Sequence, residues 1–245
     1  WNSEIKWYAQ SSGTTNSKSK FIPVSKESLE DCHYKAGKDV LCLYINNNEN
    51  SNLFSGKSLR LGGSKKILND GNKYFGDLSA ILIDNLPIWA EMMSTPNNEI
   101  SLMDKWDEKL DAVISNTINE DVTSLAGVPS WMLIMINKVL KERKVNQVKE
   151  IWKNLEVYFH GGVDFKPYKN QFKKILGNNV LYYEIYNASE GFFAIQDRND
   201  KNDMLLMLDY GIYFEFQEYS SDGTKNDEII NLSKVKLDTN YAIII

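Results

Sequence analysis

Cysteine and histidine are scarce in this sequence, which contains two of each among 245 residues. Cys32 and Cys42 cannot form the disulfide framework of a small secreted domain. If residues 25–46 are largely helical, the two thiols lie about 15 Å apart along the axis, beyond the roughly 7 Å that a bridge can span. We expect both cysteines to be reduced and buried. No group of histidines and cysteines has the spacing of zinc ligands, so no zinc site is predicted.

The sequence also lacks an excess of positive charge and any long apolar run. Its 28 basic and 33 acidic residues give a net charge of -5, so it has no basic footprint for duplex nucleic acid or for an anionic membrane. No stretch approaches the roughly 18 to 20 apolar residues that span a bilayer, and no signal peptide precedes Trp1. We therefore expect a cytoplasmic protein that binds small molecules. None of these features predicts its oligomeric state.

With 42% hydrophobic residues the chain can bury a large core, and we expect one compact domain made of two modules. In residues 1–191, predicted strands at 122–125, 155–159 and 180–186 alternate with amphipathic helices. This β-α-β-α-β order predicts an α/β fold in which helices pack on a parallel sheet. Residues 192–245 consist of strands separated by polar turns, which favours an antiparallel or barrel-like extension.

Local signals predict several individual elements. Ser25, Asp77 and Ser130 each precede an apolar helical repeat and are predicted to cap a helix. The Asp-Gly pair at 70–71 is typical of a tight hairpin turn. The asparagine-rich window 46–52 has too few apolar residues for a core position, so we expect an exposed loop there.

Residues 10–20, Gln-Ser-Ser-Gly-Thr-Thr-Asn-Ser-Lys-Ser-Lys, form a hydroxyl-rich loop between the apolar runs 5–9 and 21–24. Hydroxyl and backbone donors, one glycine that can adopt positive φ and a basic end are what the β- and γ-phosphates of a nucleotide require. The loop is not a GxxxxGK[ST] phosphate loop, because the second glycine is missing and the following Phe-Ile-Pro-Val is extended. A polar surface hairpin or a disordered tip is the alternative interpretation.

A second glycine-containing stretch, Tyr-Asn-Ala-Ser-Glu-Gly at 186–191, follows a predicted strand, and Gly161-Gly162 follows the strand before it. Since the carboxyl ends of parallel strands lie at one edge of a sheet, we expect both stretches to open on one site. Taken singly, each is also explained by a turn-forming glycine, a capping serine or a solvated glutamate. His160 lies at the same edge, where a structural role is favoured, and His33 is expected to be exposed or half-buried.

In this order, the three stretches resemble the adenylate-forming, firefly-luciferase-like superfamily. Within it, the chain is similar to the plant auxin-responsive acyl-acid amido synthetases and their bacterial relatives, and the chain is identified as part of the large amino-terminal domain of a bacterial relative. The narrower resemblance lies in 11–20 with Phe21-Ile22-Pro23, in 186–191 and in Tyr213-Phe214-Glu215-Phe216. The family's ribose-binding Tyr-Arg-x-Gly-Asp segment and mobile carboxy-terminal domain do not follow 241–245. We therefore expect a partial chain that is inactive by itself.

The resemblance implies a site for ATP and Mg²⁺ made of matching positions. It implies catalytic roles for Lys20, Ser189 and Glu190, with Glu190 also holding the magnesium ion. It implies an apolar wall of the acyl-substrate pocket at Val128 and Trp131, although ordinary core packing explains a tryptophan equally well. The implied ATP contacts are Ser11, Ser12, Gly13, Thr14, Thr15, Lys18, Gly161, Gly162, Val163, Tyr186, Asn187 and Ala188.

The implied activity is ATP-dependent adenylation of a carboxylic acid, followed by transfer of the acyl group to an amine, in particular that of an amino acid. An acyl-CoA ligase with the same first step is one alternative. A nucleotide-binding or small-acid-binding module without turnover is the other. The sequence does not identify the acid or the acceptor.

Overall fold

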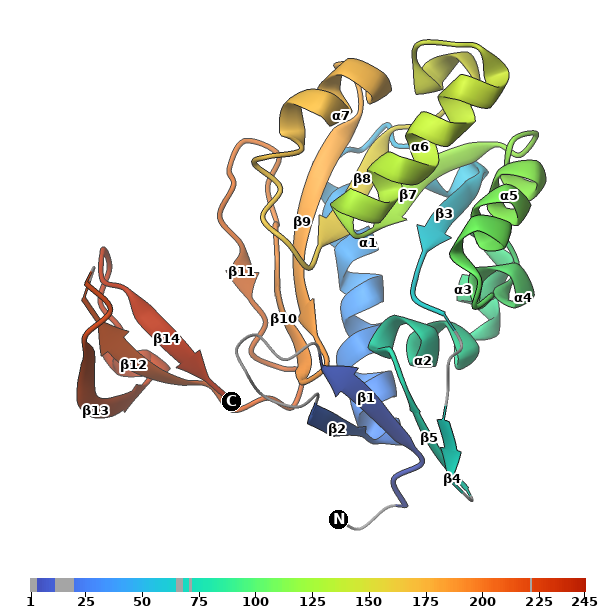
Figure 1. Ribbon diagram of the computed structural model, residues 1–245. Coiled ribbons are helices and arrows are strands. Elements are labelled where there is room, and N and C mark those ends of the chain that lie inside the picture. The colour runs from blue at the N-terminus through green and yellow to red at the C-terminus, as the bar shows by residue number, and fades with distance from the viewer. Residues whose placement is uncertain (1–3, 12–19, 65–67, 71, 221) are drawn as a thin grey trace. The chain divides into compact units, whose positions relative to one another are not determined.

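The computed structural model describes residues 4–11, 20–64, 68–70, 72–220 and 222–245 (Figure 1). The chain forms two compact units, Trp1–Met207 and Leu208–Ile245. The division lies later than the expected one between residues 191 and 192, because the strand that begins at Gly191 pairs with the main sheet of the first unit. No helix in the described ranges is long and apolar enough to cross a membrane.

A seven-stranded sheet forms the centre of the first unit, in the order β11-β10-β9-β8-β7-β3-β6. The pairs from β6 to β9 are parallel, whereas β10 and β11 are antiparallel to their neighbours. This arrangement confirms the predicted α/β fold with a parallel sheet. The strands are β3 (Lys57–Leu61), β6 (Ser94–Thr95), β7 (Val122–Gly127), β8 (Val157–Gly161), β9 (Leu181–Ala188), β10 (Gly191–Ile195) and β11 (Leu205–Leu206).

Helices α5 (Trp106–Thr117), α6 (Pro129–Arg143) and α7 (Lys169–Leu176) pack on one face of this sheet (Figure 1). They place Ile136 and Phe172 in the main hydrophobic core, where both side chains are 0% exposed. Burial of a side chain of this size contributes about 1.5–3 kcal/mol. This core holds the sheet and its three helices together.

A long helical segment packs on the other face of the sheet. It begins as a π-helix, η1 (Ser28–Tyr34), and continues as α1 (Lys35–Asn47). Ser25 Oγ accepts a hydrogen bond from the backbone N–H three residues later at 3.0 Å, which confirms the predicted cap. Cys32 in this segment is buried, but Cys42 is exposed, so the prediction that both thiols are buried is wrong for Cys42.

The end of α1 differs from the exposed asparagine loop predicted there. Asn47 Nδ2 donates to the Asp197 carbonyl at 2.5 Å, and Asn199 Nδ2 donates to Asn48 Oδ1 at 3.0 Å. These side chains therefore tie α1 to the segment that follows β10. The window is polar because it makes hydrogen bonds to distant residues, not only because it faces solvent.

A smaller four-stranded sheet, in the order β2-β1-β5-β4, belongs to the same unit. The antiparallel pairing of β4 with β5 confirms the predicted hairpin, and Asp77 Oδ1 accepts from the Ser79 N–H at 2.8 Å, which confirms the predicted cap of α2. Its core consists of Ala9, Val24, Leu29, Leu78 and Ile81. The elements are β1 (Trp7–Ser11), β2 (Lys20–Val24), β4 (Leu68–Asp70), β5 (Lys73–Gly76) and α2 (Leu78–Asp84).

The predicted cap of α6 is wrong. The helix begins at Pro129, its N-cap residue is Val128, and Ser130 lies inside the helix. Proline suits this first position because its missing N–H would have no helical partner there. The remaining elements of the first unit are η2 (Leu53–Ser55), α3 (Ile88–Met92), α4 (Asn98–Ser101) and η3 (Val148–Glu150).

The second unit is a three-stranded antiparallel sheet in the order β13-β12-β14. This sheet confirms the predicted antiparallel extension. Its longest strand is β13, at 225–231. The elements are β12 (Glu215–Tyr219), β13 (Lys225–Asn231), η4 (Leu232–Lys234) and β14 (Tyr241–Ile244).

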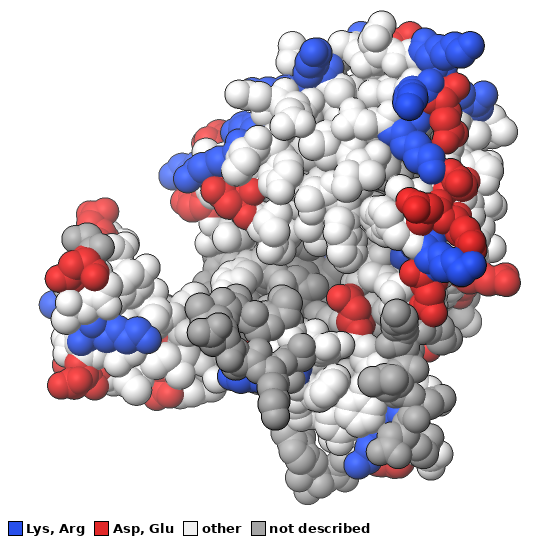
Figure 2. All heavy atoms as spheres, viewed as in Figure 1, with Lys and Arg blue, Asp and Glu red and all other residues white. Residues whose placement is uncertain are grey.

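Charged side chains of both signs are interspersed over the face shown in Figure 2. On α5 and α6, for example, Lys138 pairs with Asp111, and Lys105 pairs with Glu108 at 2.7 Å. Neither sign forms a continuous field on this face, in agreement with the small net charge of the sequence.

Candidate functional site

The stretch 186–191 forms the hairpin that joins β9 to β10. Tyr186, Asn187 and Ala188 are the last residues of β9, and Ser189 and Glu190 form the turn. The predicted strand at 180–186 therefore ends two residues too early, because pairing with β10 extends β9 through Asn187 and Ala188. Ser189 is half-buried and Glu190 is exposed.

Gly161 lies beside this strand, as expected from the shared sheet edge. It pairs with Ile185 of β9, and a Cβ at Gly161 would lie 2.3 Å from the Ile185 carbonyl oxygen. Gly162 follows with φ +81°, a conformation that favours glycine. Val163 is 42% exposed. The close backbone approach therefore requires glycine at this edge and leaves the next side chain open to a ligand.

Tyr186 has the exposure needed to contact a ligand. Its ring is 45% exposed and rests edge-on against Phe193, with the ring centroids 5.0 Å apart. Side chains alternate along a strand, and the next residue, Asn187, lines a cavity on the face covered by α1. One strand therefore presents an aromatic ring to solvent and an amide to an enclosed space.

The hydroxyl-rich loop is closed at its base by the antiparallel pair β1 and β2, with Ser11 opposite Lys20. Lys20 is exposed. Phe192 N donates to Cys32 Sγ at 3.3 Å, which ties the β9–β10 hairpin to η1, the segment that follows β2. The other predicted phosphate contacts, Ser12, Gly13, Thr14, Thr15 and Lys18, lie outside the described residues.

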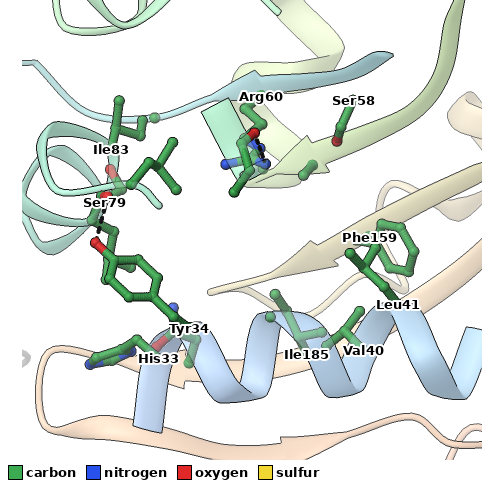
Figure 3. A pocket seen from close by; sticks show the side chains of 18 of the residues that line it. His33, Tyr34, Val40, Leu41, Ser58, Arg60, Ser79, Ile83, Phe159 and Ile185 are labelled. Atoms are coloured by element: carbon green, nitrogen blue, oxygen red, sulfur yellow. Dashed lines mark hydrogen bonds between the residues drawn. The ribbon is translucent and has the colours of Figure 1, made fainter. Parts of the chain in front are cut away.

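A cavity of about 290 Å³ lies between the sheet and the helical segment η1–α1 (Figure 3). Most of its wall is apolar, and Ile185, Asn187 and Phe192 bring the β9–β10 hairpin into it. This cavity has Asn187, one of the implied ATP contacts, in its wall. Its walls come from segments far apart in the chain, so no local pattern could have located it.

His33 lies in the wall of this cavity and is 4% exposed, so the prediction of an exposed or half-buried residue is wrong. Burial lowers its pKa from 6.5 to about 4, an effect that the side chain of Asn187 partly offsets. Within the described part of the chain, neither ring nitrogen of His33 nor Asn187 Oδ1 meets the geometry of a hydrogen bond. At neutral pH the cavity therefore has an uncharged imidazole and an amide oxygen at its hairpin end.

Arg60 lines the cavity from β3 (Figure 3). Its Nη2 donates to the Ala90 carbonyl oxygen at 3.0 Å. Burial lowers the pKa of its guanidinium to about 10, which leaves the group charged at neutral pH. No sequence pattern had indicated that Arg60 lines a cavity.

His160 lies on the opposite face of the sheet from this cavity. It is 2% exposed, and its ring stacks on Phe165 with the centroids 3.8 Å apart. Burial lowers its pKa from 6.5 to about 4. The packing agrees with the structural role favoured by the sequence.

Val128 and Trp131 do not line the cavity. Trp131 is 37% exposed and packs on Trp106 of α5, with the centroids 5.5 Å apart. Val128 lies beside Gly162, where an added Cβ would be 3.5 Å from Val128 Cγ2. Their role in an acyl pocket stays a prediction.

The described residues contain no group of three or more His, Cys, Asp or Glu side chains that could hold a metal ion. Glu190 is a single exposed carboxylate. Magnesium in nucleotide sites is commonly held by one or two carboxylates together with substrate phosphates. The geometry of Glu190 fits a magnesium ion that arrives with a nucleotide and does not fit a preformed metal site.

Residues 1–181 match the model of the GH3 family N-terminal domain. The chain belongs to this family. The stretch 186–191 lies just beyond the matched residues. The comparison with functionally curated proteins found no match.

Two solved structures have similar folds. One is an AtGH3.15 acyl acid amido synthetase in complex with 2,4-DB, with a TM-score of 0.74 and 15% identity over 98% of this chain and 50% of that chain. The other is a GH3.15 acyl acid amido synthetase, with a TM-score of 0.71 and 14% identity over 98% of this chain and 50% of that chain. The chain therefore spans about half the length of these relatives. The family and the fold expected from the sequence are confirmed.

Proposed function

We propose that the GH3-family protein containing this chain is an ATP-dependent ligase that activates a carboxylic acid as an acyl-adenylate and transfers the acyl group to an amine, in particular that of an amino acid. Family membership and the fold support this activity. The observation that carries it is the placement of β9. The strand lines an apolar cavity with Ile185 and Asn187, and it ends at the Ser189-Glu190 turn, where Glu190 is exposed.

The nucleotide would bind at the sheet edge. The backbone at Gly161 and Gly162 can approach a purine closely, and the exposed ring of Tyr186 can stack on it. Val163, the backbone of Asn187 and Ala188 would complete the adenosine contacts. The turn would then lie at the phosphates, where the Ser189 hydroxyl can donate to the α-phosphate. The loop from Ser11 to Lys20, with Lys18, would hold the leaving pyrophosphate.

Glu190 would hold a magnesium ion that accompanies the phosphates. The ion supplies charge neutralisation around the phosphate oxygens. The exposed position of Glu190 in a tight turn leaves its carboxylate free to reach these oxygens.

The acid would bind in the cavity under α1. Ligand pockets commonly enclose about 300–1,000 Å³, so a cavity of about 290 Å³ suits a compact or slender acid. Asn187 and His33 lie at the hairpin end and would orient the reacting carboxylate toward the nucleotide. The apolar wall would hold the hydrocarbon body and exclude water.

The chemistry is mainly positioning and charge stabilisation. A carboxylate oxygen attacks the α-phosphorus, the bond to the β-phosphate oxygen breaks, and pyrophosphate leaves. The amine nitrogen then attacks the acyl carbon, AMP leaves with the bonding electrons, and the amine loses a proton. The chain's own residues orient the two reactants and stabilise the departing phosphate oxygens.

Pyrophosphate release with a panel of carboxylic acids tests the first step in the full-length protein. Trapping the activated acid with amino acids or with coenzyme A identifies the acceptor. Amide formation supports the proposal, and thioester formation alone would favour an acyl-CoA ligase. Binding of ATP and acid without pyrophosphate release would indicate a binding module.

A further inference from the structure

Arg60 brings a positive charge into the otherwise apolar part of the cavity. No carboxylate in the described residues forms an ion pair with it. The sequence contains no Asp or Glu at the positions outside the described ranges. Within the described residues, the guanidinium therefore has no paired carboxylate.

The hydrogen bonds of Arg60 are also largely unused. A guanidinium has five N–H donors, and one contact joins it to the Ala90 carbonyl oxygen. The neighbouring Tyr34 hydroxyl donates to the Leu82 carbonyl oxygen at 3.0 Å. Partial burial of an unpaired cation is costly. A bound anion would neutralise the charge and accept from the remaining donors, most favourably in a bidentate pair.

The backbone of Arg60 lies far from the hairpin end of the cavity. It is opposite Ala126 on β7, which pairs with Phe159 on β8, which pairs with Tyr183 on β9. Three strand spacings, about 14 Å, therefore separate the backbone of Arg60 from β9. In Figure 3, Arg60 and His33 lie on opposite sides of the cavity. The apolar residues Phe159 and Ile185 line the space that they share.

We propose that the acid substrate carries a second anionic group, which Arg60 binds at the end of the cavity remote from the β9–β10 hairpin. The inference rests on the proposed function and specifies its substrate class. The occupant is an acid with an apolar body between a reacting carboxylate and a distal anion, with α,ω-dicarboxylic acids as the simplest example.

The test compares α,ω-dicarboxylic acids of six to twelve carbons with monocarboxylic acids of the same lengths. Pyrophosphate release by the full-length protein gives kcat/KM for each acid. A charge-assisted contact predicts that the best diacid exceeds its matched monoacid by about ten- to a hundredfold. Equal kcat/KM values, or a preference for monoacids, would overturn the inference without any variant.

Arg60→Met should lower kcat/KM far more for diacids than for monoacids and so remove the diacid preference, and Arg60→Lys should retain part of it. Arg198→Met, at an exposed arginine outside the cavity, is the control and should change neither class. If Arg60→Met lowers kcat/KM equally for both classes, Arg60 serves only as a structural partner of the Ala90 carbonyl.

Calorimetric titration of the same acids into the wild-type protein separates this inference from the proposed function. Absence of pyrophosphate release with every acid would contradict the proposed ligase activity. Tighter binding of diacids than of monoacids would still support Arg60 as an anion-binding residue. Equal binding of both classes would reject that role.

Discussion

At the sheet edge formed by β8 and the β9–β10 hairpin, side chains reach solvent, whereas Ile185 and Asn187 of β9 face the cavity beneath α1. Tyr186 is 45% exposed and Glu190 is exposed at the edge. In the cavity, His33 is 4% and Phe159 is 5% exposed. The alternation of side chains along β9 allows one strand to serve both regions. Changes to exposed side chains at the edge should therefore affect catalysis with little effect on folding, and changes to buried side chains should affect both.

Lowering the pH should reduce the free energy of unfolding through the two buried histidines, and this is the largest effect that we expect. The folded-state pKa values of His33 and His160 are about 4, below the value of 6.5 for an unburied histidine. The unfolded state therefore binds more protons between pH 6.5 and 4, and stability is lost as the pH falls through this window. Each histidine should cost on the order of 3 kcal/mol.

Denaturant unfolding at pH 7, 5.5 and 4 measures this loss. His33→Phe and His160→Phe should each flatten the pH dependence by about half of the histidine contribution. An unchanged pH dependence in both variants would contradict the assignment.

Glu190→Gln should lower adenylation by on the order of a hundredfold or more, because a neutral amide is a poorer magnesium ligand than a carboxylate. Its stability should change by less than about 0.5 kcal/mol, since the side chain is exposed in a turn. ATP–pyrophosphate exchange at low magnesium measures the activity. Glu142→Gln on the exposed face of α6 is the matched control. Exchange at the wild-type rate in Glu190→Gln would remove this residue from the mechanism.

Two glycine substitutions compare the edge with the cavity wall directly. Gly161→Ala should destabilise the protein by about 1–3 kcal/mol, because its Cβ would meet the Ile185 carbonyl oxygen at 2.3 Å. Gly37→Ala in α1 has no atom within 4 Å of the added Cβ and should stabilise by about 0.4–1 kcal/mol. Urea unfolding of the two variants should therefore give changes of opposite sign. Equal changes would show that backbone approach at Gly161 is not tight.

Thr14→Ala with Thr15→Ala should give the smallest change in stability, under roughly 1 kcal/mol, together with a loss of activity. This prediction rests on the sequence alone, since both residues lie outside the described ranges. Thermal unfolding and pyrophosphate release, both measured on the double variant, test it. A variant that melts early but retains normal activity per folded molecule would reverse the assignment.

The sequence by itself determined the elements that depend only on residues nearby in the sequence. The caps at Ser25 and Asp77, the hairpin of β4 with β5 and the parallel β-α-β order are confirmed, since hydrogen bonds and side-chain periodicity within a few residues specify them. The family and the order of its motifs were also evident. The position of Gly161 beside β9 followed from the rule that parallel strands end together.

Tertiary structure alone decided which polar residues are enclosed. Glu156 illustrates this, because its carboxylate accepts from the Tyr44 hydroxyl and the Asn52 N–H, both at 3.0 Å and both from segments over a hundred residues away. Arg60 alternates with Leu59 and Leu61 as a solvent-facing residue would, yet a cavity under α1 encloses that side of β3. A local pattern shows which face of a strand is polar. Whether that face meets water, a helix or a ligand depends on segments that only folding brings together.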